Sequence, residues 1–380
     1  MPLQGNAEIG LAYIAETTWG TTPAGALSEL RALSDSIDFK RPELKSQEFK
    51  QHRQTAGSIL GNHEVNGSIN AEFGDYLDAW LESALMGAFA SNVLKLGQTV
   101  KTFTVEKRLA RVGWALRYAG VRANGLKLSL KPGAIAQAEF PVIGKTLTTN
   151  ADCLNSPTGW LVNNVAGYAA GSTTMAIDTG STNPAANDQF TIYNAGSTTT
   201  QRGEQIYTVS SYSAPNLTFT PALDVAISDN DILHFCKPAT VINSNDPMNA
   251  FDGVLQEGGS TIAIVTGIDL SLGQGIEPAN TIGANTPAAL VAGAVELTGT
   301  MDLYVQNLAL LTKFTGGTYS TLSIALTNGS ATYTILLPRI KYAGAKITKS
   351  QGGSPVVMQM PFSGFYDGAT ELTSMKITKS

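Results

Sequence analysis

Charged residues are scarce in this chain: of its 380 residues, only 14% are Asp, Glu, Lys or Arg. The usual share is about a quarter, and small polar residues together with 38 glycines take the place of the missing charges. The formal net charge of −5 argues against a general nucleic-acid binder, because such a protein needs cationic surface to neutralise phosphates. This composition is typical of β-rich proteins that present uncharged surfaces to neighbouring subunits.

Cysteine, long apolar runs and a signal peptide are also lacking. The two cysteines are too few for a disulfide scaffold. No apolar run approaches the roughly 20 residues of a membrane helix, and the first residues lack the basic start and apolar core of a signal peptide. We therefore expect a protein that is made in a cytoplasm and does not insert into membranes.

Motifs that carry catalysis or bind cofactors are missing as well. The sequence has no phosphate-binding loop, no Gly-x-Ser-x-Gly elbow and no helix with paired histidines. The three histidines, His52, His63 and His234, fall in different predicted elements. Residues 229–231, Asp-Asn-Asp, offer the oxygen ligands that calcium prefers, but a plain acidic turn between strands is the interpretation we favour. We predict no enzyme activity, no cofactor and no metal.

The chain is organised around residues 64–87. Residues 64–73 alternate between polar and apolar side chains, which is the period of a half-buried β-strand. A helix is predicted directly afterwards, with Asp75 as its cap and Gly87 as its left-handed end. Its apolar residues recur at helical spacing: Tyr76, Leu77, Trp80, Leu81, Ala84 and Leu85.

The same pattern recurs 232 positions later, where Gly299 takes the place of Gly67. Residues 295–305 alternate as a strand, Asn307 stands in the cap position, a shorter apolar stripe follows, and Gly316-Gly317 ends it. Further matches are residues 37–39 with 268–270, and 125–129 with 344–348. We interpret these matches as an internal duplication built from antiparallel hairpins.

A long connection precedes the organising strand in each copy, residues 40–61 and 271–293. Loops of this length are usually functional or interaction elements, and because the charge differs between the copies, a contact surface is favoured over a catalytic one. Nucleic-acid binding by the first loop is the weaker alternative, since Glu43 interrupts its basic residues. The candidate contact residues are Lys40, Arg41, Lys45, Glu48, Phe49, Lys50, Arg53, Glu277 and Asn280.

Residues 147–238 separate the two copies and differ from both. Five short strand candidates, residues 174–177, 189–193, 204–209, 217–220 and 232–235, alternate with turn residues at fairly regular spacing, which indicates a small all-β domain. Cys153 and Cys236 flank this segment. A disulfide between them is conceivable because domain ends often lie close together, but two buried thiols are the interpretation we favour. Residues 1–28 are expected to form an arm outside the core.

Three stretches resemble one protein family. Residues 14–25 (IAETTWGTTPAG), residues 55–69 (TAGSILGNHEVNGSI) with the helix that follows, and residues 118–144 are similar to tail tube, or major tail, proteins of long-tailed bacteriophages. The type with two fused tube domains, found in non-contractile tails, is the most similar. The resemblance implies a mainly β fold in which each tube domain is a β-sandwich with one flanking α-helix. We expect tube domains at 1–146 and 239–380 and an inserted all-β domain at 147–238, on the exterior of the tube.

The resemblance also implies a structural virion protein without catalysis. Three chains would form a pseudo-hexameric ring, and the rings would stack into a tube that conducts DNA without specific binding. Its other partners would be the tape measure, the tail terminator and the tail-tip proteins, with assembly in the cytoplasm of the host. We hypothesise that one polar strand face lines the bore, with Glu64, Glu72, Glu296 and Asp302; a plain solvated sheet is the alternative.

Two other functions remain open. The inserted domain could be a tail-borne adhesin that binds glycans, with the tube as its scaffold. A polysaccharide hydrolase is less favoured, because it requires two carboxylates at an acid–base separation in a cleft, and no such pair stands out in the sequence.

Overall fold

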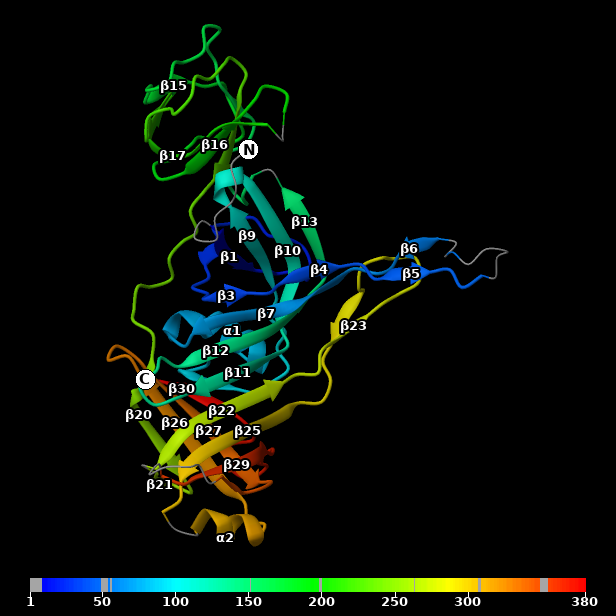
Figure 1. Cartoon of the computed structure of the whole chain (residues 1–380), viewed down its shortest axis with the longest axis vertical. Coiled ribbons are helices and arrows are strands. Elements are labelled where there is room, and N and C mark those ends of the chain that lie inside the picture. The colour runs from blue at the N-terminus through cyan, green and yellow to red at the C-terminus, as the bar shows by residue number, and fades with distance from the viewer. Residues whose placement is uncertain are drawn as a thin grey trace. The chain divides into compact units, whose positions relative to one another are not determined.

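Antiparallel strands make up most of the computed structural model, which describes residues 9–48, 54, 57–150, 152–197, 200–262, 264–306, 309–348 and 355–380 (Figure 1). The chain divides into two compact units, each assembled from several segments. Unit 1 comprises Met1–Leu30, Phe103–Gly120 and Thr146–Ile242, and unit 2 comprises Arg31–Thr102, Val121–Lys145 and Asn243–Ser380. The expected mainly β class is confirmed.

Unit 2 contains a long antiparallel sheet to which both copies of the duplicated pattern contribute. β11 at the end of the first copy pairs with β22 at the start of the second, over six residues from Gly125↔Gly273 to Leu130↔Ile268. The order across the sheet is β4 (Asp38–Lys40), β7 (Glu64–Glu72), β12 (Gln137–Gly144), β11 (Gly125–Leu130), β22 (Val265–Gly273), β25 (Glu296–Tyr304), β29 (Val357–Gly364) and β28 (Lys346–Thr348).

A second set of strands continues from β29 in unit 2. β29 pairs with the end of β27, and β27 pairs with β26 and β30. β26 pairs with β20, which also pairs with β21, and β30 pairs with β8. The short β3 pairs with β7. The bounds are β3 (Ser34–Asp35), β8 (Val93–Lys95), β20 (Asn249–Glu257), β21 (Ser260–Thr261), β26 (Ser320–Thr327), β27 (Thr332–Tyr342) and β30 (Lys376–Lys379).

The two faces of the long sheet differ as the alternation predicts. Successive side chains of a strand point to opposite faces, and one face is almost completely buried. That face carries Val65, Ile69 and Ala71 of β7, Leu126 and Leu128 of β11, Leu270 and Leu272 of β22, Leu297, Met301 and Leu303 of β25, and Met358, Met360 and Phe362 of β29. Its burial supplies the core of unit 2, and the opposite face is polar.

There is a physical reason for a glycine at both Gly67 and Gly299. A Cβ on Gly67 would lie 2.5 Å from the carbonyl oxygen of Ser36, and a Cβ on Gly299 would lie 2.8 Å from the carbonyl oxygen of Asp269. Both glycines therefore let the preceding strand approach the organising strand closely. Gly67 also has φ +152°, which side chains other than glycine rarely adopt.

The predicted helices form, with corrections at their ends. The first is a 3₁₀ turn, η2 (Asp75–Leu77), followed by α1 (Asp78–Leu85). Asp75 makes no cap hydrogen bond to the helix; its Oδ2 accepts from Asn245 Nδ2 at 2.7 Å instead. The left-handed residue is Met86, and Gly87 follows because a Cβ there would lie 2.4 Å from the carbonyl oxygen of Lys95.

The second helix is α2 (Ala309–Thr315). It ends as predicted at the two glycines, where Gly317 has φ +61°. The predicted cap, Asn307, lies outside the described residues. Over the part of the chain that the structure describes, no helix is both long enough and apolar enough to span a membrane.

Each long connection forms a hairpin that leaves the same end of the long sheet. In the first copy β5 (Glu43–Lys45) pairs with β6 (Ser58–Leu60), and in the second β23 (Glu277–Ala279) pairs with β24 (Ala289–Val291). We call these hairpins the first arm and the second arm. Figure 1 shows β5 and β6 reaching away from the strands that they connect.

Unit 1 contains a second sheet, and the expectation of an N-terminal arm outside the core is wrong for its described residues. β1 (Ile9–Ala15) pairs with β9 (Phe103–Leu109) over seven residues and with β2 (Ser28–Glu29), while the first part of β10 (Trp114–Ala123) pairs with β13 (Thr146–Asn150). Ala12 and Tyr13 of β1 are buried. The strand was missed because small residues conceal its alternation.

A half-buried carboxylate orders the turn after β1. Glu16 Oε1 accepts hydrogen bonds from the backbone N–H of Gly120 and from Thr104 Oγ1, both at 2.8 Å. Its other oxygen accepts from the N–H of Gly20 at 2.8 Å, and Trp19 Nε1 donates to the carbonyl of Gly120 at 3.2 Å. The stretch at residues 14–25 therefore holds the start of the chain on β10.

Residues 147–238, which we call the middle segment, form a separate six-stranded sheet, also in unit 1. Its order is β14-β19-β16-β17-β18-β15, and its core contains Trp160, Phe190, Tyr207, Phe219 and Phe235. All five predicted strands are present, and β14 was missed. The domain bounds 1–146, 147–238 and 239–380 stay a prediction. The strands are β14 (Trp160–Leu161), β15 (Thr174–Ala176), β16 (Gln189–Tyr193), β17 (Gln201–Ser213), β18 (Asn216–Thr220) and β19 (Ile232–Cys236).

We predict that Gly299→Ala lowers the free energy of unfolding by about 1–3 kcal/mol, the usual cost of overpacking a filled site. Gly67→Ala costs more, because its φ adds backbone strain. Urea unfolding of the purified protein measures both changes. Gly57→Ala is the control, since a Cβ there would meet nothing within 4 Å. Equal stabilities of Gly299→Ala and the control would contradict the close approach.

Candidate functional site: the polar face of the long sheet

The four predicted carboxylates lie on the same, polar face of the long sheet. Glu64 and Glu72 end β7, and Glu296 and Asp302 occupy β25, at positions that alternate with the buried residues. The cross-strand register places further charges on this face. Carboxylates outnumber lysines by seven to three on it: Asp38, Glu64, Glu72, Glu139, Asp269, Glu296 and Asp302 against Lys40, Lys127 and Lys346.

The middle of this face is a shallow groove of about 530 Å³ across the junction of the two copies. One row of directly opposed residues crosses it, from Asn70 through Glu139, Lys127, Ser271 and Thr298 to Ser363. Lys127 Nζ lies 2.9 Å from Glu139 Oε1, and Ser129 Oγ donates to Asp269 Oδ1 at 2.6 Å. The groove is therefore polar, shallow and partly self-paired, with no catalytic arrangement among these residues.

Glu139, Lys127 and Asp269 were not among the predicted site residues. The sequence did contain a signal for two of them, because Lys127 alternates with Leu126 and Leu128, and Asp269 stands between Ile268 and Leu270. What it lacked was the register between β12, β11 and β22, which brings the three charges onto one face.

The predicted loop residues spread over both arms and do not form one cluster. Lys40 ends β4, Arg41 Nε donates to the carbonyl of Gly61 at 3.2 Å, and Lys45 of β5 lies 3.9 Å from Glu43. Glu48 accepts from Ser46 Oγ at 3.2 Å. Glu277 begins β23, and Asn280, which follows it, is exposed. Phe49, Lys50 and Arg53 lie outside the described residues.

His63 lies between the first arm and β7. Its ring contacts Phe39 edge-on, with centroids 4.9 Å apart, and its backbone N–H donates to the carbonyl of Asn285 in the second arm at 2.7 Å. Burial, followed by the charge of Arg41, lowers the pKa of His63, so the ring is neutral at pH 7. This position suits a surface or interface histidine better than a metal ligand.

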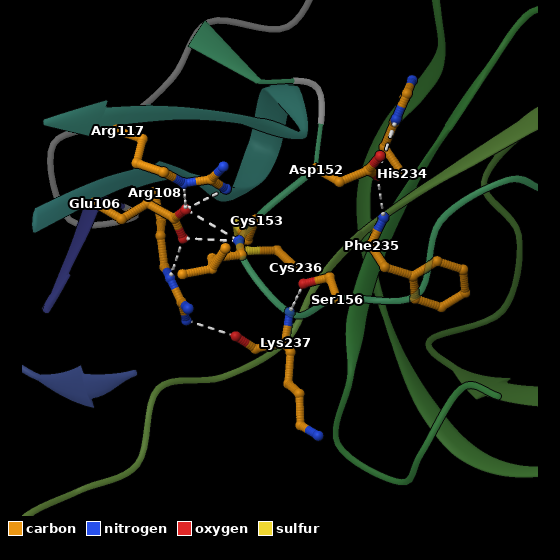
Figure 2. Close-up of a disulfide and its surroundings, with 11 residues drawn as sticks. Glu106, Arg108, Arg117, Asp152, Cys153, Ser156, His234, Phe235, Cys236 and Lys237 are labelled. Atoms are coloured by element: carbon orange, nitrogen blue, oxygen red, sulfur yellow. Dashed lines mark hydrogen bonds and ion pairs between the residues drawn. A yellow bond between two sulfur atoms is a disulfide. The ribbon is translucent and has the colours of Figure 1, made fainter. Parts of the chain in front are cut away.

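A second cluster of charges lies in unit 1, where the middle segment joins β9 and β10 (Figure 2). Glu106 is fully buried, and its carboxylate receives Arg108 Nε at 3.1 Å and Arg117 Nη2 at 2.8 Å. It also accepts from the backbone N–H of Leu154 at 3.0 Å, and Arg108 Nη1 donates to the carbonyl of Lys237 at 2.5 Å. Glu106 and Arg108 thus bind the chain where it enters the middle segment, at Leu154, and where it leaves it, at Lys237. We call these two places the crossings. Burial lowers the pKa of Arg108, and the charge of Glu106 opposes that shift.

Cys153 and Cys236 form a disulfide between the two crossings, so the favoured interpretation as two free thiols is wrong. Burial of both residues was anticipated, but their pairing depends on the distance between chain segments 83 residues apart. Asp152 Oδ1 accepts from the N–H of Phe235 at 3.3 Å and contacts His234 Nδ1 at 3.2 Å. Figure 2 shows these residues around the disulfide.

The acidic turn at residues 229–231 serves the fold. Asp231 accepts from the N–H of Ala195 at 3.0 Å and of Ser228 at 2.7 Å, and pairs with Arg202 at 2.8 Å. Asp229 accepts from the N–H of Asn164 at 2.9 Å. Within the described ranges no group of three or more His, Cys, Asp or Glu is placed to hold a metal ion.

The fold is thus that of a duplicated antiparallel β protein whose two repeats share one long sheet. The model of the family described as phage tail tube protein matches this chain twice, over residues 6–233 and 217–364. The chain therefore belongs to the phage tail tube protein family, and it is a structural component of the phage tail. A search of the curated proteins finds no match.

Glu106→Gln is predicted to lower the free energy of unfolding by about 3–5 kcal/mol, because it leaves one buried and one half-buried guanidinium group without a charged partner. Glu139→Gln is the matched control: it removes a carboxylate from a pair with Lys127 that water reaches, where exposed pairs contribute less than about 1 kcal/mol. Thermal and urea unfolding measure both. Equal losses for the two variants would show that the Glu106 cluster does not hold the middle segment.

Proposed function

We propose that this protein polymerises into the phage tail tube as stacked rings of three chains, each ring pseudo-hexameric, and that the tube conducts DNA from capsid to host. The observation that carries the proposal is the pairing of β11 with β22. This pairing already joins two tube repeats edge to edge, so the same junction between chains extends the sheet without any new type of contact.

The two outer edges of the long sheet correspond to the two strands of that junction. β28 is the copy of β11 and, among the described residues, pairs with β29 alone; β4 is the copy of the end of β22 and, in the same part of the chain, pairs with β7 alone. Unpaired strand edges favour association with another strand. Leu128 of β11 is 1% exposed, whereas its counterpart Ile347 of β28 is 53% exposed. A neighbouring β4 would cover Ile347 as β22 covers Leu128.

The duplication sets the register of the junction between chains. Leu128 stands opposite Leu270 within the chain, and Leu270 lies opposite Gly299 as Ile37 lies against Gly67. Ile347 therefore stands opposite Ile37 of the neighbour, with Phe39 next along the same apolar face. The same register puts Lys346 opposite Asp38, which lies 3.6 Å from Lys40, so opposite charges face each other across the junction.

The number of strands supports a ring of three chains. Each chain supplies eight strands to the long sheet, and three chains would supply about 24. At about 4.8 Å between neighbouring strands, the circumference is roughly 115 Å and the diameter roughly 37 Å, and strand tilt widens it further. The bore then has room for side chains and a DNA duplex. A closed ring uses one heterologous interface whose rotation closes.

The polar face is the surface that we assign to the bore. Its excess of carboxylates, including Glu64, Glu72, Glu296 and Asp302, repels phosphates, so DNA passes without binding. The apolar face of the sheet is already covered, which leaves the polar face free to meet water and DNA.

The remaining assignments rest on the family. The arms, with Lys40, Lys45, Glu277 and Asn280, mediate contacts between copies, and the middle segment lies on the exterior. The tube meets the tape measure, terminator and tip proteins, is assembled in the host cytoplasm, and has no catalytic role.

A cross-linking experiment tests the ring. In the variant Phe39→Cys/Ile347→Cys, we expect a short bismaleimide to join chains in assembled tubes and give a ladder on denaturing gels that ends at a circular trimer. The disulfide does not react with maleimide, and each single variant is the control. A ladder that continues beyond three chains would contradict the trimeric ring, and the absence of any product would contradict the β28–β4 junction.

Charge reversal tests the bore. Phages in which Glu64, Glu72, Glu296 and Asp302 are changed to Lys should eject DNA several-fold more slowly than the parent, because the lysines bind phosphates. The delay should shrink as salt rises, since salt weakens phosphate contacts. Ejection triggered in vitro measures the rate, and Glu204→Lys in the middle segment is the control. An unchanged rate would remove this face from the bore.

A further inference from the structure

We propose that an apolar hollow on the second repeat receives the first arm of another copy of this chain. The inference rests on the proposed ring and adds to it a second contact, distinct from the β28–β4 junction. We define the hollow by four of the residues that line it, Val295, Phe365, Tyr366 and Leu372.

The hollow has a volume of about 370 Å³ in unit 2 and is also lined by Leu96, Leu297 and Gly364, with Thr373 and Ser374 as its polar residues. All four residues that define it are large and apolar, and each is 40% to 60% exposed. Single exposed apolar side chains are ordinary on a protein surface, but a contiguous group of them marks an interaction site. The hollow therefore calls for a partner with an apolar surface.

The chain already contains the corresponding contact between its own repeats. The second arm reaches the base of the first repeat, where the backbone N–H of His63 donates to the carbonyl of Asn285 at 2.7 Å. At the root of this arm, the N–H of Ile276 donates to Asn124 Oδ1 at 2.8 Å. The first repeat is thus a docking surface for the arm of the repeat that follows it in the sheet.

The duplication transfers this contact to the hollow. His63 precedes β7, and the residue 232 positions later, Val295, precedes β25. The hollow on the second repeat therefore occupies the place at which the first repeat meets an arm. The 380 residues contain two repeats, and we assign the arm at that place to another copy of the chain.

The first arm has the surface that the hollow requires. Leu44 and Ile59 stand opposite each other on its two strands, and Leu60 follows Ile59. All three are more than half exposed. Exposure of these apolar side chains to water is unfavourable in free energy. Contact with the apolar lining of the hollow would remove them from water.

The β28–β4 junction brings the two surfaces to the same end of the sheet. Lys40, which ends β4, stands opposite Glu64. The cross-strand register places Glu296 of β25 and Gly364 of β29 at that same end. A neighbour that adds its β4 to β28 therefore projects its first arm, which begins after Lys40, at the end of the sheet where the hollow lies.

Assembly of purified full-length variants tests the inference. Ile59→Asp in the arm and Tyr366→Asp or Leu372→Asp in the hollow should each raise the protein concentration needed for tubes by at least about tenfold, the effect of 1.4 kcal/mol per contact. Val165→Asp, at a residue that is 94% exposed in the middle segment, is the control. Thermal unfolding of each variant checks that the monomer remains folded. Normal assembly of the arm and hollow variants would overturn the inference.

Mixed cross-linking shows which chain supplies the arm. One population of chains carries Ile59→Cys and the other Tyr366→Cys, and a bismaleimide should join them only when they assemble together. A missing product in tubes would overturn the inference while the ring stands, provided that Phe39→Cys/Ile347→Cys still gives trimers. If the unaltered chain forms no rings, the proposed function and this inference fail together.

Discussion

The pairing between β11 and β22 is the constraint on which the rest of the structure depends. Six residues on each strand join two repeats that are separated in the chain by the whole middle segment. The junction makes one sheet with one buried face and one polar face, and it places a pair of arms at one end. Without it, Leu128 and Leu270 would be exposed edge residues, as Ile347 is.

In unit 1, a disulfide and a cluster of charged residues hold the middle segment, which lies between the two repeats in the chain. Two chain crossings converge at the Cys153–Cys236 disulfide, and the carboxylate of Glu106 binds the first crossing while Arg108 binds the second. Tyr193 in the middle segment adds a hydrogen bond to the carbonyl of Val112 at the tip of β9 and β10. Buried ion pairs contribute little net stability, but each partner depends strongly on the other. The cluster therefore holds the two crossings in one geometry.

Local sequence patterns predict much of this structure, and the remainder depends on which distant strands pair and in which register. The alternation around Gly67 and Gly299, the two helices and all five predicted strands of the middle segment follow from side-chain period and turn residues. The β11–β22 junction, the charge row through Glu139 and Lys127, and the disulfide depend on which distant strands meet, and no period records that. Asp75 was misassigned for the same reason, because its carboxylate binds Asn245, which is 170 positions away.

Among the described residues the middle segment occurs once, between β13 and β20, and the cluster of Glu106, Arg108 and Arg117 that holds it belongs to the first repeat. Any surface made by extending the long sheet therefore carries a middle segment at every second repeat, and bare repeats alternate with decorated ones. In the proposed tube, the middle segments therefore recur with twice the period of the repeats. A molecule that recognises the middle segments meets sites spaced by a whole chain, with a gap one repeat wide between them.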